Sequence, residues 1–193
     1  MITHIQGRLI EKNPTDVVID CNGVGYFLNI SLHTYSRISD NEQLKLYTHL
    51  HVREDAQTLF GFADKSERDV FRLLISVSGI GTSTARTLLS SLTPVQVRDA
   101  ITADDVAVIQ SVKGIGAKTA QRVILDLKDK VLKIYGGEEI SEDKGNTNRE
   151  EALSALEVLG FARKQSEKVV DKIAKGSPDL SVEGIIKNAL KML

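Results

Sequence analysis

Cysteine, tryptophan and long apolar runs are scarce in this sequence. Its 193 residues include one cysteine, Cys21, and no tryptophan. A single thiol excludes an internal disulfide framework, and Cys21 has no evident histidine partner, so we expect a small buried residue and no thiol nucleophile. No run approaches the about 18 apolar residues of a membrane span, and residues 1–4 do not open a signal peptide. We therefore expect a cytoplasmic protein that does not enter the membrane.

Neither sign of charge dominates. The chain has 25 Lys and Arg against 26 Asp and Glu, whereas proteins that coat nucleic acid non-specifically carry a large positive excess. The distribution is uneven, because residues 64–135 hold 11 basic against 8 acidic side chains and residues 136–148 hold one against four. The basic part therefore lies in the middle, and an acidic segment separates two folded pieces.

The sequence has few residues that could bind a metal ion or a cofactor. The four histidines all fall within residues 1–63, and no Cys/His cluster has the spacing of a metal site. His49 and His51 share one face of a predicted strand, but two ligands make a weak site. We expect no metal, no cofactor and no catalytic centre.

Apolar and polar residues alternate over much of residues 1–63, as they do in β-strands. Turn residues at 13–15, 22–25 and 40–42 can reverse the chain between the predicted strands. Five short strands in so short a stretch are typical of a small barrel of the OB type. The predicted strands are Ile2–Glu11, Asp16–Cys21, Tyr26–Ser31, Gln43–Val52 and Thr58–Phe62.

Helical patterns begin at Asp64, where Asp64–Glu67 has the spacing of a capping box. Further helix starts are predicted at Thr93-Pro94 and at Thr102–Asp105. Residues 136–148 have too few apolar side chains to order and predict a flexible linker. Residues 149–193 predict three short helices. The fold class is thus α+β and multidomain: an OB-like barrel over 1–63, helices over 64–135, and a small three-helix domain over 149–193.

An internal repeat is the most informative feature of the sequence. Residues 77–85 (VSGIGTSTA) match residues 112–120 (VKGIGAKTA) at an offset of 35 residues. Valine, both glycines, isoleucine, threonine and alanine coincide, and amphipathic helices flank each copy. The sequence therefore predicts a helix, a glycine turn and a second helix, twice over.

Each Gly-Ile-Gly turn predicts a site for phosphate. Glycine allows a tight turn, isoleucine can fill the crevice between the helices, and the first N–H groups of the next helix are left facing outward, where the helix dipole favours an anion. Contacts from backbone carry little sequence information, which suits recognition of DNA shape. The predicted phosphate-binding residues are Gly79, Ile80, Gly81, Thr82, Ser83, Thr84 and Arg86 in the first copy, and Gly114, Ile115, Gly116, Lys118, Thr119 and Arg122 in the second.

Other interpretations of the turns are open at this point. A single Gly-x-Gly turn usually only joins packed helices, and it is the duplication that favours function. Residues 114–119 resemble the tail of a nucleotide-binding loop, but Val112 and Ala117 stand where that motif needs glycine, and a helix precedes the turn where a strand is needed. A nuclease, glycosylase or ligase module would need catalytic residues that we do not find. The main alternative is a helical adaptor that binds a protein partner and uses the hairpins only structurally.

The layout resembles the RuvA family, the junction-binding subunits of bacterial branch-migration complexes, over essentially the whole chain. The resemblance rests on the barrel, the tandem helix-hairpin-helix motifs and a small helical domain after a variable linker. Residues 52–56 (VREDA) and 59–62 (LFGF) are similar to the family's strand-end sequence. Two departures are that Thr82-Ser83-Thr84 has no counterpart of Lys118, and that Lys113 stands where the family often has proline.

The resemblance implies a function and partners. It implies a homotetramer that holds a four-way (Holliday) junction open and square-planar, singly or as two tetramers face to face, with Glu54 and Asp55 as an acidic pin at the centre. It implies that residues 149–193, similar to ubiquitin-associated folds, recruit a separate hexameric ATPase of the RuvB type for recombination and repair. A resolvase of the RuvC type is a further candidate partner. The residues expected to contact the ATPase are Leu156, Leu159, Gly160, Phe161, Ile185, Ile186 and Leu190.

Overall fold

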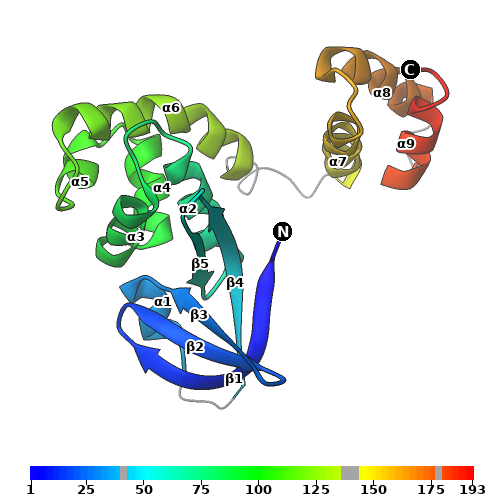
Figure 1. The fold of residues 1–193 in the computed structure, drawn as a ribbon. Coiled ribbons are helices and arrows are strands. Elements are labelled where there is room, and N and C mark those ends of the chain that lie inside the picture. The colour runs from blue at the N-terminus through cyan, green and yellow to red at the C-terminus, as the bar shows by residue number, and fades with distance from the viewer. Residues whose placement is uncertain (40–42, 136–143, 177–179) are drawn as a thin grey trace. The chain divides into compact units, whose positions relative to one another are not determined.

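A computed structural model of the chain describes residues 1–39, 43–135, 144–176 and 180–193. The chain divides into two compact units, Met1–Glu138 and Glu139–Leu193. Figure 1 shows the first unit as a strand barrel joined to a group of helices, and the second as a separate group of three helices. The two units are described one at a time.

Five strands form a closed barrel in the spatial order β1-β2-β3-β5-β4. Strand β1 pairs with both β2 and β4, which closes the ring, and β3 pairs with β5 in parallel, with Asn29 opposite Phe60. This arrangement confirms the predicted OB-like barrel. The strands are β1 (His4–Asn13), β2 (Asp16–Cys21), β3 (Val24–Asn29), β4 (Gln43–Val52) and β5 (Gln57–Phe62).

The hairpin turn between β2 and β3 is tighter than the sequence suggested. Asn22 and Gly23 both have positive φ, of 53° and 89°, and Cys21 pairs directly with Val24. Two residues with positive φ make a turn whose twist matches that of the strands. The strand therefore begins at Val24, inside the predicted turn, and ends at Asn29. The predicted turn at 40–42 lies outside the described residues.

A short helix, α1 (Leu32–Arg37), was not predicted. The Ser31 hydroxyl caps it by accepting a hydrogen bond from the Thr34 N–H at 3.0 Å. The helix packs beside α3, and its Tyr35 packs against the barrel core. That core consists of seven buried aliphatic side chains: Ile5, Val17, Ile19, Leu28, Ile30, Ile38 and Leu46.

The helical half of the first unit begins where the sequence predicted. Asp64 caps α2 by accepting from the Glu67 N–H at 2.8 Å, and Thr93 and Gln96 form a capping box at the start of α4. The prediction for the next helix was wrong in detail: Thr102 is the last residue of α4, and Asp105 caps α5. The helices are α2 (Lys65–Ile75), α3 (Thr82–Ser91), α4 (Pro94–Thr102), α5 (Val106–Gln110) and α6 (Ala117–Tyr135).

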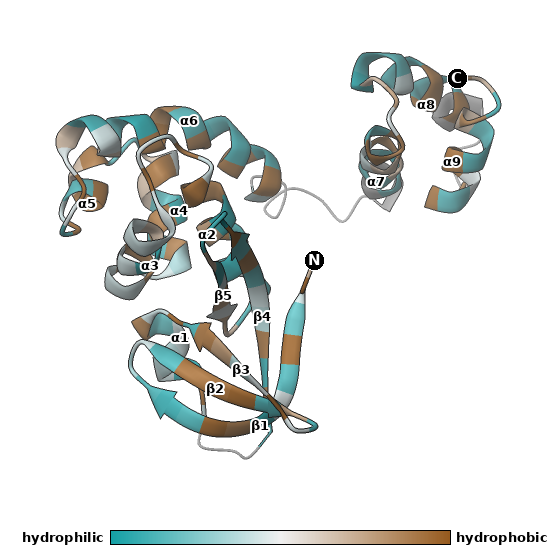
Figure 2. Cartoon of the chain, viewed as in Figure 1, coloured by the Kyte–Doolittle hydropathy of each residue, from teal (hydrophilic) through white to brown (hydrophobic). Residues whose placement is uncertain are grey.

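One core joins the barrel to these helices. Phe60 and Phe62 of β5 lie 5.1 and 4.9 Å from the ring centre of Phe71 on α2, and all three side chains are buried. Figure 2 shows the apolar stripes of α2, α4 and α6 among the polar surfaces of the helices. Because aromatic contacts of this size bury much apolar area, the barrel and helices hold a fixed relation within this unit.

A buried carboxylate also fastens the barrel to the helices. Glu67 of α2 has no exposed side-chain surface, and it accepts hydrogen bonds from the hydroxyls of Ser31 and Thr34. Thr34 in turn accepts from the Ala63 N–H at 3.0 Å. Burial raises the pKa of Glu67, although the two hydroxyl donors oppose that rise.

The second unit contains α7 (Lys144–Val158), α8 (Arg163–Gly176) and α9 (Val182–Ala189). Its core is built from Ala152, Leu153, Leu156, Val170, Ile185 and Ala189. Arg163 pairs with Glu150, Glu157 and Glu167 and so ties α8 to α7.

The start of α7 corrects the predicted linker over 136–148. Residues 144–148 are helical, and the Asn148 amide donates to the Leu180 carbonyl at 3.3 Å. Tertiary contact of this kind extends a helix into a segment whose composition alone does not favour one. Residues 136–143 lie outside the described residues.

Candidate nucleic-acid interface

The two repeats form hairpins with the same backbone geometry. Gly79 and Gly114 have φ of 95° and 93°, a region that side chains other than glycine rarely adopt. The Ile80 N–H donates to the Val77 carbonyl at 3.0 Å, and the Ile115 N–H donates to the Val112 carbonyl at 3.1 Å. Both turns therefore reverse the chain in the same way.

Apolar side chains hold each turn in place. Val77 and Ile80 in the first hairpin, and Val112 and Ile115 in the second, are each no more than 5% exposed. The isoleucine side chains thus belong to the core and cannot themselves touch a ligand. Each turn presents to solvent its backbone, its glycines and one further residue, Ser78 in the first hairpin and Lys113 in the second.

The repeat extends one residue further than the matching sequence stretches. Ser76 and Ser111, also 35 residues apart, each close the preceding helix by donating a hydroxyl hydrogen bond at 2.7 Å, to the carbonyls of Leu73 and Val108 respectively. The extension could have been predicted from the sequence, because a serine stands one position before each copy of the repeat. They fix how each helix enters its turn.

The helix that follows each turn starts with free amide groups. The first intrahelical donors are Ala85 and Ala120, which bond to the Gly81 and Gly116 carbonyls at 2.9 Å. Gly81 offers no side-chain cap to α3, and a Cβ atom placed on Gly81 or Gly116 would meet no other atom within 4 Å. Open space in front of unpaired N–H groups at a helix N-terminus is where an anion binds most readily.

The polar side chains of the second hairpin lie in different surroundings. Lys118 is exposed in the first turn of α6, and Thr119 is half-buried beside it. Arg122 donates to the Ser78 carbonyl at 3.2 Å, so the helix after the second turn touches the loop of the first. The structure thereby brings the two predicted phosphate sites together.

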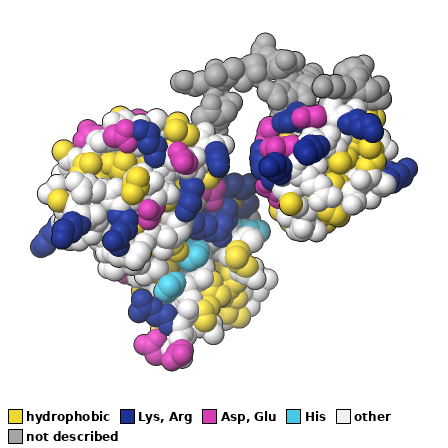
Figure 3. Space-filling view, turned by 90° about the horizontal axis from the view of Figure 1, so that it is seen from above, with side chains coloured by type: hydrophobic (Ala, Val, Ile, Leu, Met, Phe, Trp, Pro, Cys, Tyr) yellow, Lys and Arg dark blue, Asp and Glu magenta, His cyan; other side chains and the backbone are white. Residues whose placement is uncertain are grey.

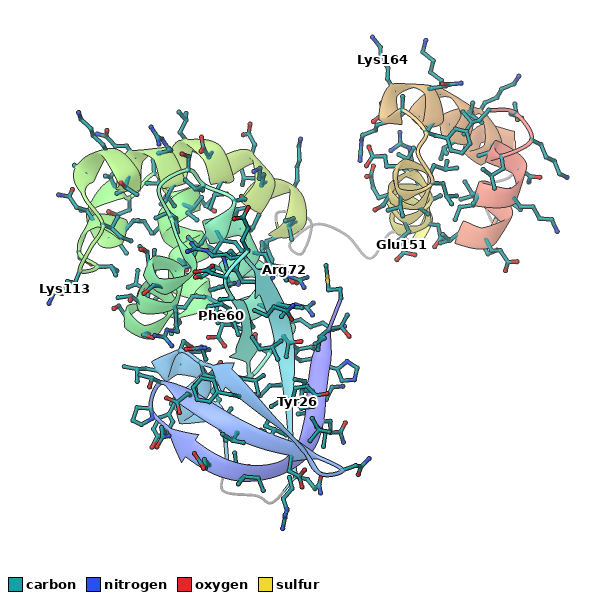
Figure 4. The ribbon with its side chains drawn as sticks, in the orientation of Figure 1. Tyr26, Phe60, Arg72, Lys113, Glu151 and Lys164 are labelled. Atoms are coloured by element: carbon teal, nitrogen blue, oxygen red, sulfur yellow. The ribbon has the colours of Figure 1, made fainter. Side chains whose placement is uncertain are left out.

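Lys113 is a further cation of the second hairpin, at the position that Ser78 occupies in the first. It is exposed, and Figure 4 shows it extending from the tip of the hairpin into solvent. Figure 3 shows lysine and arginine side chains projecting from the edge of the helical half. A flexible lysine there can follow a phosphate without fixed geometry.

Hydroxyl groups replace lysine in the first hairpin. Ser83 is exposed, whereas Thr82 and Thr84 are half-buried. Arg86, predicted to bind phosphate, donates instead to the barrel, to Asn29 Oδ1 at 2.8 Å and to the Thr15 carbonyl at 3.3 Å. Neutral hydroxyl donors bind phosphate more weakly than ammonium groups do, so the first hairpin depends more on its backbone.

Glu54 and Asp55 lie together in the turn between β4 and β5. Both are exposed, and the Arg53 N–H closes the turn by donating to the Ala56 carbonyl at 2.8 Å. The turn therefore holds two carboxylates outward at the end of a long hairpin. A negative charge in this position repels phosphates.

The residues of the second unit that were predicted to contact a partner fall into a buried group and an exposed group. Leu156 and Ile185 are buried in the unit's own core, which corrects the expectation that they contact a partner, and Phe161 is half-buried against the same core. Leu159 and Leu190 are exposed. Gly160 has φ of 96° in the turn after α7.

A shallow groove on this unit includes residues that the sequence did not single out. Val158 is 86% exposed, and it stands out of register with the buried positions of α7, which was the available signal. Figure 4 shows Glu151 at the surface of the same helix. The groove is lined by Glu151, Ser154, Ala155, Val158, Leu159 and Ile186.

Candidate metal sites and membrane-spanning helices are absent from residues 1–39, 43–135, 144–176 and 180–193. Among those residues there is no group of three or more His, Cys, Asp or Glu side chains that could hold a metal ion. No helix there is both long enough and apolar enough to cross a membrane.

Family models match three stretches of the chain. A model described as the RuvA N terminal domain matches residues 1–61, a SAM-like helix-hairpin-helix tandem matches residues 71–129, and the RuvA C-terminal domain matches residues 147–193. The three models therefore cover the barrel, both hairpins and the second unit.

Curated relatives match the chain from end to end. Identity is 67% with a protein of Christiangramia forsetii, 62% with one of Flavobacterium psychrophilum and 50% with one of Bacteroides thetaiotaomicron. Each match covers 100% of this chain and 100% of the relative. All three relatives are named Holliday junction branch migration complex subunit RuvA.

Proposed function

The chain belongs to the RuvA family, and on that premise we propose that it binds four-way (Holliday) DNA junctions as a subunit of a branch migration complex. We further propose that this binding takes place in the cytoplasm and serves recombination and DNA repair.

The paired hairpins carry the proposal. Two glycine turns with matching φ each leave a helix N-terminus unobstructed, and Arg122 links the two. A pair of anion sites at a fixed separation can hold two phosphates of a DNA backbone. Since backbone amides position DNA without reading its bases, the interface selects by shape.

The acidic turn contributes to selectivity by repulsion, whereas the hairpins contribute by attraction. We assign Glu54 and Asp55 to the centre of the junction, where their charges repel the phosphates of an uninterrupted duplex and separate the strands at the crossover. Four copies of the turn would meet there if the protein is a homotetramer, which is the assembly we propose, as one tetramer or as two that enclose the DNA.

The second unit is assigned to a partner. The exposed Val158 and Leu159 line an apolar groove on a small independent domain, a surface that suits a hydrophobic segment of another protein. We propose that this partner is the RuvB-type ATPase, that this chain has no catalytic activity of its own, and that a RuvC-type resolvase can join the complex.

A gel-shift titration tests the proposal. A synthetic four-way junction is compared with linear duplex of equal length, at two salt concentrations and without nucleotide or metal. We expect a strong preference for the junction and an affinity that falls steeply with salt. Equal, weak binding to both DNAs would refute junction recognition and favour the protein-binding adaptor.

A further inference from the structure

A row of positive side chains lies on the first unit where β4 meets α2. The odd-numbered residues of β4 face outward, because Leu46 and Thr48 between them point into the barrel and are buried. Lys65, Arg68 and Arg72 share one face of α2 alongside. We call the following residues the β4–α2 stripe: Lys45, Tyr47, His49, His51, Arg53, Lys65, Arg68 and Arg72.

Tyr47 joins the strand to the helix within this stripe. The Nζ atoms of Lys45 and Lys65 lie 5.5 and 5.9 Å from the centre of its ring, and the guanidinium carbon of Arg68 lies 5.6 Å from it. Three cations thus surround one half-buried aromatic ring. Further along β4, the rings of His49 and His51 stack with their centres 6.4 Å apart.

The positive charges of the stripe are only partly compensated. Asp69 pairs with Arg68 at 3.4 Å and with Arg72 at 4.0 Å. Burial lowers the pKa of Arg72, and repulsion from Arg68 lowers it further. Burial also lowers the pKa of His49, and the positive charge of Arg72 adds to that effect. Cations that repel one another in this way gain free energy when an anion binds among them.

The stripe leads to the acidic turn. Arg53 Nε donates to His51 Nε2 at 3.2 Å, and Glu54 and Asp55 follow directly. Figure 3 shows a row of lysine, arginine and histidine side chains on the first unit, with acidic side chains beyond one end of the row. Figure 4 places Arg72 beside β4, on the other side of the helical half from Lys113 of the second hairpin. The stripe is therefore a surface separate from the hairpins.

We propose that the β4–α2 stripe binds the phosphate backbone of a single DNA strand that passes the acidic turn. Outward side chains recur along a strand about every 7 Å, a spacing near that of successive phosphates in an extended DNA strand. Cations interleaved with aromatic rings are the usual composition of surfaces that bind single strands. The proposal rests on the junction-binding function, since strands separate where a junction branches.

The test uses the full chain and a fluorescent single-stranded oligonucleotide of mixed sequence, with anisotropy titrations at 50 and 200 mM salt. Lys45→Gln with Lys65→Gln removes two exposed cations. Lys164→Gln with Lys168→Gln removes the same charge from α8 of the second unit, where both lysines are exposed.

Removing one cation that binds a phosphate lowers the slope of log affinity against log salt by about 0.7 for single strands. For the Lys45/Lys65 variant, the loss of affinity between the two salt concentrations should become about sevenfold smaller. The Lys164/Lys168 variant should keep the wild-type slope on the single strand.

An unchanged slope in the Lys45/Lys65 variant would overturn the proposal. An unchanged slope together with a smaller mass in light scattering would also overturn it, and would assign the stripe to contact between copies of the chain. The junction-binding function is tested separately, by measuring whether the wild-type protein prefers a junction over linear duplex.

Discussion

The two glycines of the second hairpin make separable predictions, because the structure gives them different backbone conformations. Gly114 has φ of 93°, whereas the φ of Gly116 lies outside the left-handed region. A Cβ atom meets nothing within 4 Å at either position, so neither substitution to alanine causes a steric clash in the free protein. Any loss of stability must then come from the backbone conformation or from the start of the helix, not from a steric clash.

The expected magnitudes follow from this difference. Gly114→Ala forces alanine into a left-handed conformation and should lower the free energy of unfolding by about 1–2 kcal/mol. Gly116→Ala should change it by no more than about 0.5 kcal/mol, because the smaller freedom of alanine in the unfolded chain offsets the poorer fit of alanine at the residue that precedes α6. The new methyl group, however, occupies the open space in front of the first amides of α6. Loss of one charge-assisted hydrogen bond costs about 1.5–3 kcal/mol, which weakens junction binding about 10- to 150-fold.

Urea unfolding and junction titration, carried out on both variants, measure the two effects independently. We expect Gly116→Ala to be about as stable as the wild type and defective in binding, and Gly114→Ala to be destabilised. A stable Gly116→Ala protein with wild-type affinity would show that no phosphate approaches the N-terminus of α6. A Gly114→Ala protein with unchanged stability would refute the strain argument.

Three further predictions concern charge. Lys118→Ala should weaken junction binding and lower the slope of log affinity against log salt by about 0.9 for each phosphate that the side chain binds; an unaltered slope would argue against a phosphate at Lys118. Glu54→Gln with Asp55→Asn should raise the affinity for linear duplex in a gel shift, and unchanged duplex affinity would exclude the pin. Glu67 has a raised pKa when folded, so its contribution to stability is present below its unfolded pKa and is lost as pH rises through its folded pKa. The stability of the wild type relative to Glu67→Gln, measured by urea unfolding, should therefore fall as pH rises above about 4.5, and a difference independent of pH would contradict the burial argument.

The sequence by itself determined the features that depend on neighbouring residues. Gly79 and Gly114 could be assigned to turns because few other residues adopt positive φ, and Asp64 and Thr93 could be assigned as helix caps because a cap bonds to an amide three residues away. The barrel followed from the alternation of short strands between turn residues. These are local properties of the chain, and local sequence encodes them.

Only the tertiary structure decided which of several similar residues are exposed to solvent. Arg86 and Lys118 are both cations of a helix that follows a glycine turn, yet Arg86 bonds to Asn29 of the barrel, 57 residues away in sequence, while Lys118 is exposed. Leu156 and Val158 are both apolar residues of α7, but packing of α8 and α9 buries the first and leaves the second exposed. The helical register of α7 does indicate that Val158 is exposed. No local pattern shows that Arg86 bonds to the barrel, because that contact joins segments that are distant in sequence.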